Sequence, residues 1–319
     1  MQQRVHSRLA LRAEGWAIMD IFLPVAGISV NIFVLSGAGA LVGFLSGLLG
    51  VGGGFLLMPI LMMLGVPPTV AAASDTCAIV ATSSSGMAAH YRLGNVDSRM
   101  GVLLLLGGLS GAAIGVQIIK LLRATGSADL FITFTYVIVL SGVGIYMLAE
   151  SIQSLRRGAL VRPSQVVKPI GFFGKLPLQI YFPKSGVQAS IFAPYLLCGL
   201  KGILAAIMGV GGGFIMVPMM VYILRMPMRV VVGTDLFQIL FTCTGMTIMH
   251  AVTNQTVDLP LALLVATGST LGAQVGARLS RHLKGDVLKI ILAVVVLVVT
   301  IQMAVSLTLT PLSRLSYPR

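Results

Sequence analysis

The chain has 319 residues, of which 56% are hydrophobic and only 10% are charged, and its mean hydropathy is +0.98. A water-soluble domain of this length would carry many more charged side chains, so the composition excludes a soluble enzyme and indicates a protein whose main solvent is lipid. The formal net charge of +13 does not indicate a nucleic-acid partner, because the basic residues fall mostly in short connections between apolar runs, where they contact lipid headgroups and set topology.

The first apolar segment begins near Trp16, behind three arginines, and continues to about Gly50. It is longer than the apolar region of a signal peptide, so we predict a retained membrane element, with residues 1–17 as a tail in front of it. Several later runs reach about 20 apolar residues, the length that a helix needs to cross a bilayer. The predicted fold class is therefore an all-α, polytopic membrane protein.

The motif GVGGGF occurs twice, at Gly50–Phe55 and at Gly209–Phe214, which gives an offset of 209 − 50 = 159 residues. Proline follows at the same distance in both copies, and histidines and glycines recur at nearly the same offset. Self-similarity at a fixed offset predicts two homologous repeats. The matched pairs are Pro59 and Pro218, Pro68 and Pro227, His90 and His250, Gly107 and Gly268, Gly111 and Gly272, and Gly115 and Gly276.

Each predicted repeat contains a helix that ends at the glycines, a short half-helix and three further spans. The first repeat covers 18–150 and the second covers 189–310, followed by a tail at 311–319. The polar segment 151–188 between them is rich in Lys and Arg, which indicates a cytoplasmic linker. The predicted apolar elements are 18–49, 54–65, 69–91, 98–121 and 127–150, and then 189–208, 213–224, 228–252, 258–280 and 286–308.

The sequence alone leaves the relative orientation of the two repeats open. The linker 151–188 and the basic loop with Arg278, Arg281 and Lys284 can both be cytoplasmic only if the second repeat crosses an odd number of times, which implies inverted repeats. If the half-helices after the glycines are re-entrant, the prediction changes to parallel repeats.

Consecutive glycines at membrane depth are costly, because glycine disfavours helix and the freed backbone groups find no water there. Two such breaks at corresponding positions are typical of a transporter's binding site. A half-helix that begins at a break presents unpaired N–H groups and the positive end of its dipole, which favours a small anion. The alternative is a close helix crossing at small residues. The predicted substrate contacts here are Gly52, Gly53, Gly54, Gly211, Gly212 and Gly213.

Ionisable residues inside membrane spans are functional candidates by default. Asp75 and Asp235 lie at corresponding positions and suit ion coupling or a proton relay, the alternative being that they cap the half-helices. Lys201 can either offer its charge to the anion or extend to the membrane interface. His90 and His250 are further coupling candidates, although histidines at helix ends are commonly interfacial. Ser74, Thr76, Thr234 and Gln238 are predicted to line the substrate site.

Other sequence patterns argue against metal binding, nucleotide binding and nucleophilic catalysis. The glycine triplets at Gly107 and Gly268 repeat every four residues and predict close helix packing. The cysteines lie singly in apolar runs, so no metal site is predicted, and GVGGG lacks the Lys-Ser/Thr of a phosphate-binding loop, so no nucleotide cofactor is predicted. The serines and histidines form no nucleophile motif, and no catalytic residue is assigned.

The stretch GFLSGLLGVGGGFLLMPILMMLGVPP, the SDT that follows it, and GLKGILAAIMGVGGGFIMVPMM with GTD in the second half resemble the TauE/SafE sulfite exporters, also called the toluene sulfonate uptake permeases. The resemblance extends over about residues 36–308. It implies transport of sulfur-containing anions such as sulfite, sulfoacetate or related organosulfonates, driven by a proton or other ion gradient. The long basic linker 151–188 departs from a minimal member and leaves the substrate subgroup open.

Residues and resemblance together lead us to expect a secondary transporter, an exporter working by alternating access in the bacterial inner membrane. Its expected partners are a small anionic substrate and the lipid bilayer, with no nucleic acid, and it is expected to be a monomer or a homodimer. The alternatives are an anion channel or an uptake permease for sulfonates or carboxylates. An enzyme is not expected.

Overall fold

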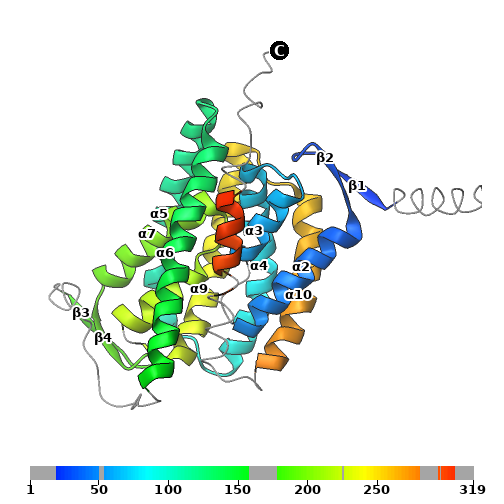
Figure 1. Cartoon of the computed structure of the whole chain (residues 1–319). Helices are drawn as coiled ribbons and strands as arrows, with labels where there is room; N and C mark the ends of the chain where they lie inside the picture. Colours follow the sequence, from blue (N-terminus) through cyan, green and yellow to red (C-terminus); the bar gives the residue numbers. More distant parts are fainter. Residues whose placement is uncertain are drawn as a thin grey trace, which may run out of the picture.

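The structure, a computed structural model, describes residues 19–49, 54–157, 178–224, 226–280, 294 and 296–305. Its helices run side by side in one bundle, and a short two-stranded hairpin lies at each end (Figure 1). Within the described residues, four helices are long and apolar enough to cross a membrane. The prediction of a mostly helical, multi-pass membrane protein is confirmed. The four helices are Ser98–Ala124, Ala128–Tyr146, Val230–Asn254 and Leu259–Gly276.

The elements follow one order in both halves of the chain: a hairpin, a helix that ends at the glycines, a short helix, and further long helices. In the first half they are β1 Asp20–Leu23, β2 Ile28–Asn31, α2 Ile32–Leu49, α3 Gly54–Met63, α4 Pro68–Arg92, α5 Ser98–Ala124 and α6 Ala128–Arg157. In the second half they are β3 Gln179–Phe182, β4 Val187–Ser190, α7 Phe192–Met208, α8 Gly213–Pro218, η2 Met219–Ile223, α9 Met228–Met249, η3 His250–Asn254 and α10 Leu259–Ser280, and a further apolar helix covers Val296–Val305.

The two hairpins correct the sequence prediction, which assigned 18–49 to one apolar helix and 151–188 to a linker. In the first, Asp20 pairs with Asn31, and in the second, Gln179 pairs with Ser190, both antiparallel. Each turn begins with proline and ends with a glycine at positive φ, Gly27 at +69° and Gly186 at +65°. Proline and glycine three residues apart favour a tight turn over a continuing helix, so the segments fold back on themselves.

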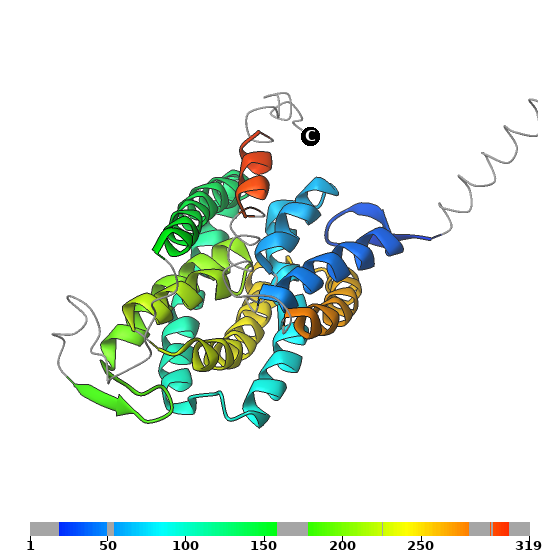
Figure 2. The same ribbon diagram turned by 60° about the horizontal axis from the view of Figure 1, so that its bottom comes forward.

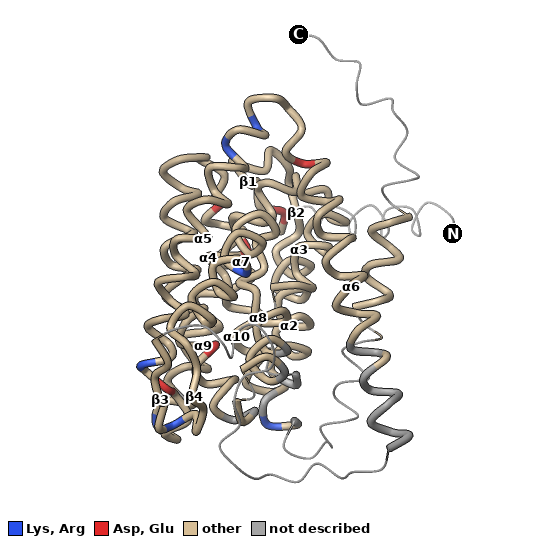
Figure 3. Tube along the Cα trace, turned by 90° about the vertical axis from the view of Figure 1, so that its left-hand side faces the viewer, with Lys and Arg blue, Asp and Glu red and all other residues tan. Residues whose placement is uncertain are grey.

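The two halves run in opposite directions through the bundle. Helices α4 and α9 are antiparallel, because Thr76 Oγ1 lies 3.1 Å from Thr247 Oγ1 while Gly86, farther along α4, faces Leu236 near the start of α9. The hairpins β1–β2 and β3–β4 accordingly lie at opposite ends (Figures 1 and 3). Figure 3 also shows that the charged positions are concentrated at these two ends, with few inside the bundle.

The opposite directions of the two halves contradict the prediction that re-entrant half-helices would make the two repeats parallel. Helix α2 starts directly after hairpin β1–β2, whose tip is bonded through Val25 N to Asp258 Oδ2 (2.9 Å). Asp258 N is in turn bonded to Ser74 Oγ (2.9 Å), near the start of α4, so α3 returns the chain to the end where α2 began. The pair α2 and α3 therefore makes no net crossing, and the three helices that follow give an odd count.

Each first helix packs against the fourth helix of the other half, α2 against α10 and α7 against α5. Figure 2 shows α2 (blue) lying along α10 (orange). A Cβ added to Gly272 would lie 2.0 Å from Ala40 O, and one added to Gly111 would lie 2.0 Å from Gly199 O. The backbones approach too closely for any side chain at these positions, which confirms the predicted packing role of the glycine stripes.

Replacing Gly111 by alanine should lower the melting temperature of the detergent-solubilised protein, because the added methyl group would force α5 and α7 apart. Overpacking of this kind costs about 1–3 kcal/mol. Gly142 on α6 is the matched control, since a Cβ there meets no atom within 4 Å. The melting temperature of Gly142→Ala should be unchanged or slightly higher. Equal melting temperatures for the two variants would contradict the close contact.

Candidate anion site at the glycine breaks

The start of α3 and the second glycine break meet inside the bundle. Phe55 and Phe214, which follow the two breaks at equivalent positions, have ring centroids 5.7 Å apart. A Cβ on Gly54 would lie 3.1 Å from Val210 O, so the start of α3 touches the second break directly. Gly52 and Gly53, which were predicted to contact the substrate, lie outside the described residues. The described part of the site is therefore Gly54 and the second break.

The second break is a loop that only glycine can form at low cost. Gly209, Gly211 and Gly212 have φ values of +72°, +65° and +76°, in the left-handed region. Such values are strained for residues with a side chain. The first bonds of the following helix run from Ile215 N and Met216 N to Gly212 O. The N–H groups at the start of α8 thus have no partner within the helix, as at any helix N-terminus.

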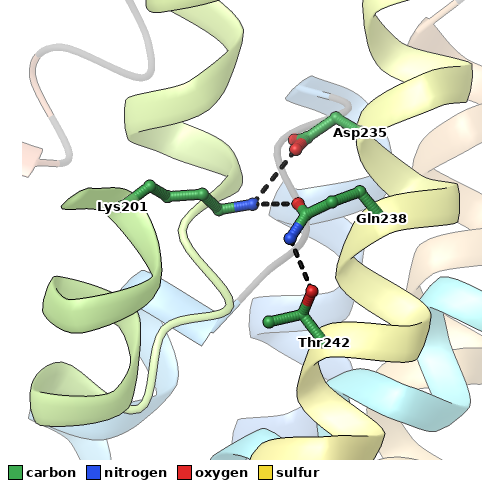
Figure 4. Close-up of polar contacts among 4 residues, drawn as sticks. All are labelled: Lys201, Asp235, Gln238 and Thr242. Carbon is green, nitrogen blue, oxygen red and sulfur yellow. Dashed lines mark hydrogen bonds and ion pairs between the residues drawn. The ribbon is translucent and has the colours of Figure 1, made fainter. Parts of the chain in front are cut away.

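A buried polar network lies against this loop (Figure 4). Lys201, on α7, reaches Asp235 Oδ1 with its Nζ at 3.2 Å and also donates a hydrogen bond to Gln238 Oε1; both partners are on α9. Gln238 Nε2 then donates to Thr242 Oγ1 at 2.7 Å. Lys201, Asp235 and Gln238 are at most 3% exposed. The sequence-predicted residues Lys201, Asp235 and Gln238 are therefore brought together.

Glycines make room for the network. A Cβ on Gly212 would lie 2.4 Å from Lys201 Cε, so the lysine stem runs directly over the loop. On the other side, a Cβ on Gly108 of α5 would lie 2.6 Å from Gln238 Nε2. With 1% exposure, Lys201 does not extend to the membrane interface, which excludes one of the two alternatives for this residue. Its ammonium has three protons, and Asp235 and Gln238 accept two, which leaves one donor without a partner among the described residues.

Asp75, the counterpart of Asp235, has different surroundings. It is 1% exposed, and neither of its carboxyl oxygens has a hydrogen-bond partner within the described part of the chain. A Cβ on Gly54 would lie 2.9 Å from Asp75 Oδ2, so the carboxyl lies beside the start of α3. It makes no capping hydrogen bond to a described N–H group there, contrary to the alternative that we considered.

The predicted hydroxyls have partners away from Lys201. Ser74 Oγ accepts a hydrogen bond from Asp258 N at 2.9 Å, and Thr234 Oγ1 accepts one from Asp97 N at 3.0 Å. Thr76 Oγ1 donates to Ala73 O at 2.7 Å. Ser74 and Thr234 therefore hold loops at opposite ends of the bundle.

Sequence reasoning missed Asp97 and Asp258, which are buried and separated by 258 − 97 = 161 residues. Asp97 Oδ2 accepts hydrogen bonds from Ser185 Oγ at 2.5 Å and from Ser185 N at 3.2 Å, at the tip of hairpin β3–β4. Asp258 Oδ2 binds Val25 N and Ala26 N at the tip of hairpin β1–β2. We call these contacts the hairpin clamps. Their sequence signal is the offset of 161, which the glycine stripes share.

The two histidines lie outside the Lys201 network. His250 is only 3% exposed, and its Nε2 lies 3.2 Å from Ala206 O while its Nδ1 lies 3.2 Å from Asn254 Nδ2. His250 is therefore packed inside protein rather than exposed at the helix end. His90 is partly buried near the end of α4, with its Cβ 3.2 Å from the Cβ position of Gly233. In the described ranges, no group of three or more His, Cys, Asp or Glu side chains could hold a metal ion.

Comparisons with known proteins find similar membrane transporter proteins. The sequence profile described as sulfite exporter TauE/SafE matches residues 35–303. The probable membrane transporter protein YunE of Bacillus subtilis is 25% identical over 259 residues, which cover 77% of this chain and 87% of that protein. A probable membrane transporter protein of Xylella fastidiosa is 28% identical over 244 residues, covering 76% of this chain and 82% of the relative.

A plant protein is similar over a shorter region. The sulfite exporter TauE/SafE family protein 3 of Arabidopsis thaliana is 34% identical over 122 residues, covering 36% of this chain and 26% of that protein. No solved structure matches the chain.

Proposed function

Because the chain belongs to the TauE/SafE sulfite exporter family and is a membrane transporter, we propose that it carries small sulfur-containing anions by secondary transport. The substrates that we propose are sulfite, sulfoacetate or related organosulfonates. A sulfur oxyanion is small, carries its charge on several oxygens and accepts hydrogen bonds, so it suits a site made of one ammonium group and backbone N–H groups.

One observation carries the proposal: a fully buried lysine lies across the glycine loop that begins α8. Lys201 brings a positive charge to within contact of Gly212, deep in a bundle whose spans hold few ionisable groups. Intramembrane charges of this kind face a substrate pathway in most transporters. Gln238 and Thr242 extend the polar surface beside it. We place the bound anion between the free Lys201 N–H and the amides of Gly211 to Gly213.

The inverted halves support alternating access. Halves that run in opposite directions and contact each other at a central site can rock so that the site opens first at one end and then at the other. Gly54 and Val210 touch across this contact, so the motion would change the site itself. We further propose that transport is coupled to a proton or ion gradient, for which Asp75, Asp235, His90 and His250 are the candidate residues.

Direction and location are parts of the same proposal. We propose export across the bacterial inner membrane, with hairpin β3–β4 at the cytoplasmic end. Arg92, Arg99 and Lys184 lie at this end, near Asp97, and Lys184 Nζ donates to Val96 O at 3.1 Å. Cytoplasmic ends of membrane proteins are enriched in Lys and Arg. The assembly is proposed to be a monomer or a homodimer.

The test is a binding screen followed by flux measurements. Purified protein should bind sulfite or sulfoacetate more tightly than acetate in calorimetry. Proteoliposomes should then show saturable flux of the bound anion that depends on an imposed gradient. Flux that does not saturate would support an anion channel, and tighter binding of carboxylates would support a carboxylate permease. Binding of none of the tested anions would refute the proposal.

A further inference from the structure

The two buried aspartates have corresponding positions but unequal partners. Asp75 and Asp235 are separated by 235 − 75 = 160 residues. Asp235 is paired with Lys201, whose counterpart in the first half is Val42, since 201 − 159 = 42. The counterpart of Gln238 is Ala78, since 238 − 160 = 78. The first half thus has apolar side chains where the second half has the cation and the amide.

Among the described residues, the groups around Asp75 supply no compensating charge. Tyr136 of α6 and Cys243 of α9 lie close enough to feel the charge of Asp75. The Tyr136 hydroxyl already donates a hydrogen bond to Phe55 O at 2.6 Å. Helices α2 and α3 contain no ionisable residue, Lys201 of α7 is bonded to Asp235, and Arg278 of α10 lies at the opposite end of that helix from Asp258.

An ionised carboxylate in such surroundings is strongly unfavourable, because a buried charge without a partner costs several kcal/mol. A protonated carboxyl carries no net charge and avoids most of this cost. A metal cation is less suited than a proton to neutralise this carboxylate, because hard cations need several oxygen ligands at once. Across the described residues, no cluster of three or more metal-ligating side chains includes Asp75. The geometry therefore favours a bound proton.

We propose that Asp75 is the carboxyl that binds the coupling proton, and that Asp235 is a positioning residue that holds Lys201 at the glycine loop. The inference deepens the proposed function and rests on it. Gly54 touches both the Asp75 carboxyl and Val210 of the glycine loop, so the two sites share one wall. A negative charge on Asp75 would repel an anion at that loop, whereas the protonated form would not. The proton and the anion therefore bind together.

The first test needs no substrate. Infrared difference spectra, recorded while the pH is raised, should show the carbonyl band of a protonated, buried carboxyl in the wild-type protein. The band should be absent from Asp75→Asn, a nearly isosteric change, and should persist in the matched control Asp235→Asn. A wild-type protein without this band near neutral pH, or a band that persists in Asp75→Asn, would overturn the proposal.

The second test measures protons taken up when sulfoacetate binds in weakly buffered solution, at a pH above the midpoint of the infrared titration, where Asp75 of the free protein is ionised. The wild-type protein should take up about one proton per bound anion, while Asp75→Asn should bind sulfoacetate and take up none. Asp235→Asn should bind more weakly but keep the proton stoichiometry. Proton uptake by Asp75→Asn equal to the wild type would refute the role of Asp75. Failure of the wild type to bind sulfoacetate would instead count against the proposed substrate, and the infrared result would still decide the proton site.

Discussion

Replacing Lys201 by methionine should abolish the binding of sulfite and sulfoacetate and also destabilise the protein. The variant removes the buried cation at the glycine loop and leaves Asp235 as a buried charge without its partner. Breaking a buried ion pair from one side typically costs about 3–5 kcal/mol. Calorimetry would measure anion binding, and thermal unfolding in detergent would measure stability.

A double variant separates the two effects. Lys201→Met combined with Asp235→Leu removes both charges, so most of the lost stability should return, because apolar replacements of buried ion pairs are commonly neutral or stabilising. Anion binding should stay lost, since no cation remains at the loop. Binding in the double variant within about twofold of the wild type would show that Lys201 does not contact the anion.

Replacing Gly212 by alanine should also remove anion binding, through geometry rather than charge. The residue has φ at +76°, and its new methyl group would lie 2.4 Å from Lys201 Cε and 2.7 Å from Lys201 Cγ. The lysine stem must therefore move away from the loop, and its contact with Asp235 is lost with it. We expect at least tenfold weaker binding of sulfite, measured by calorimetry.

The matched control is Gly126→Ala, in the connection between α5 and α6. Gly126 has nearly the same backbone angle, with φ at +71°, but a Cβ there meets no atom within 4 Å. Both variants incur the left-handed strain of about 1–2 kcal/mol, but only Gly212→Ala displaces Lys201. Gly126→Ala should therefore lose some stability and bind sulfite normally. Equal binding by the two variants would show that the contact between Gly212 and Lys201 is unimportant.

Much of the helical architecture follows from the sequence, because apolar length and glycine position act locally. The expected element at 54–65 corresponds to α3, and the expected span at 228–252 corresponds to α9 and η3. The spacing of four between Gly107, Gly111 and Gly115 also predicted a contact surface without naming its partner. The first hairpin was missed because its strands continue the neighbouring apolar run, and the second because β3 lies within the polar segment 151–188.

The site was only partly predictable, because its contacts join residues that are distant in the chain. Lys201 and Asp235 are on different helices, and their pairing depends on how α7 packs against α9. Asp75 looked equivalent to Asp235 by position. The difference between them depends on Val42 and Ala78, whose importance is visible only after the two halves are compared in space.

The hairpin clamps have a consequence for how the molecule moves. Asp97 ties hairpin β3–β4 of the second half to a loop of the first, and Asp258 ties hairpin β1–β2 of the first half to a loop of the second. Each tie crosses from one half to the other, and both are closed here. Any tilt of one half against its neighbour must break charge-assisted hydrogen bonds at one rim, each worth about 1.5–3 kcal/mol. For the proposed alternating access, we therefore expect the carboxylates of Asp97 and Asp258, at the two rims, to raise the energy barrier to exposing the centre.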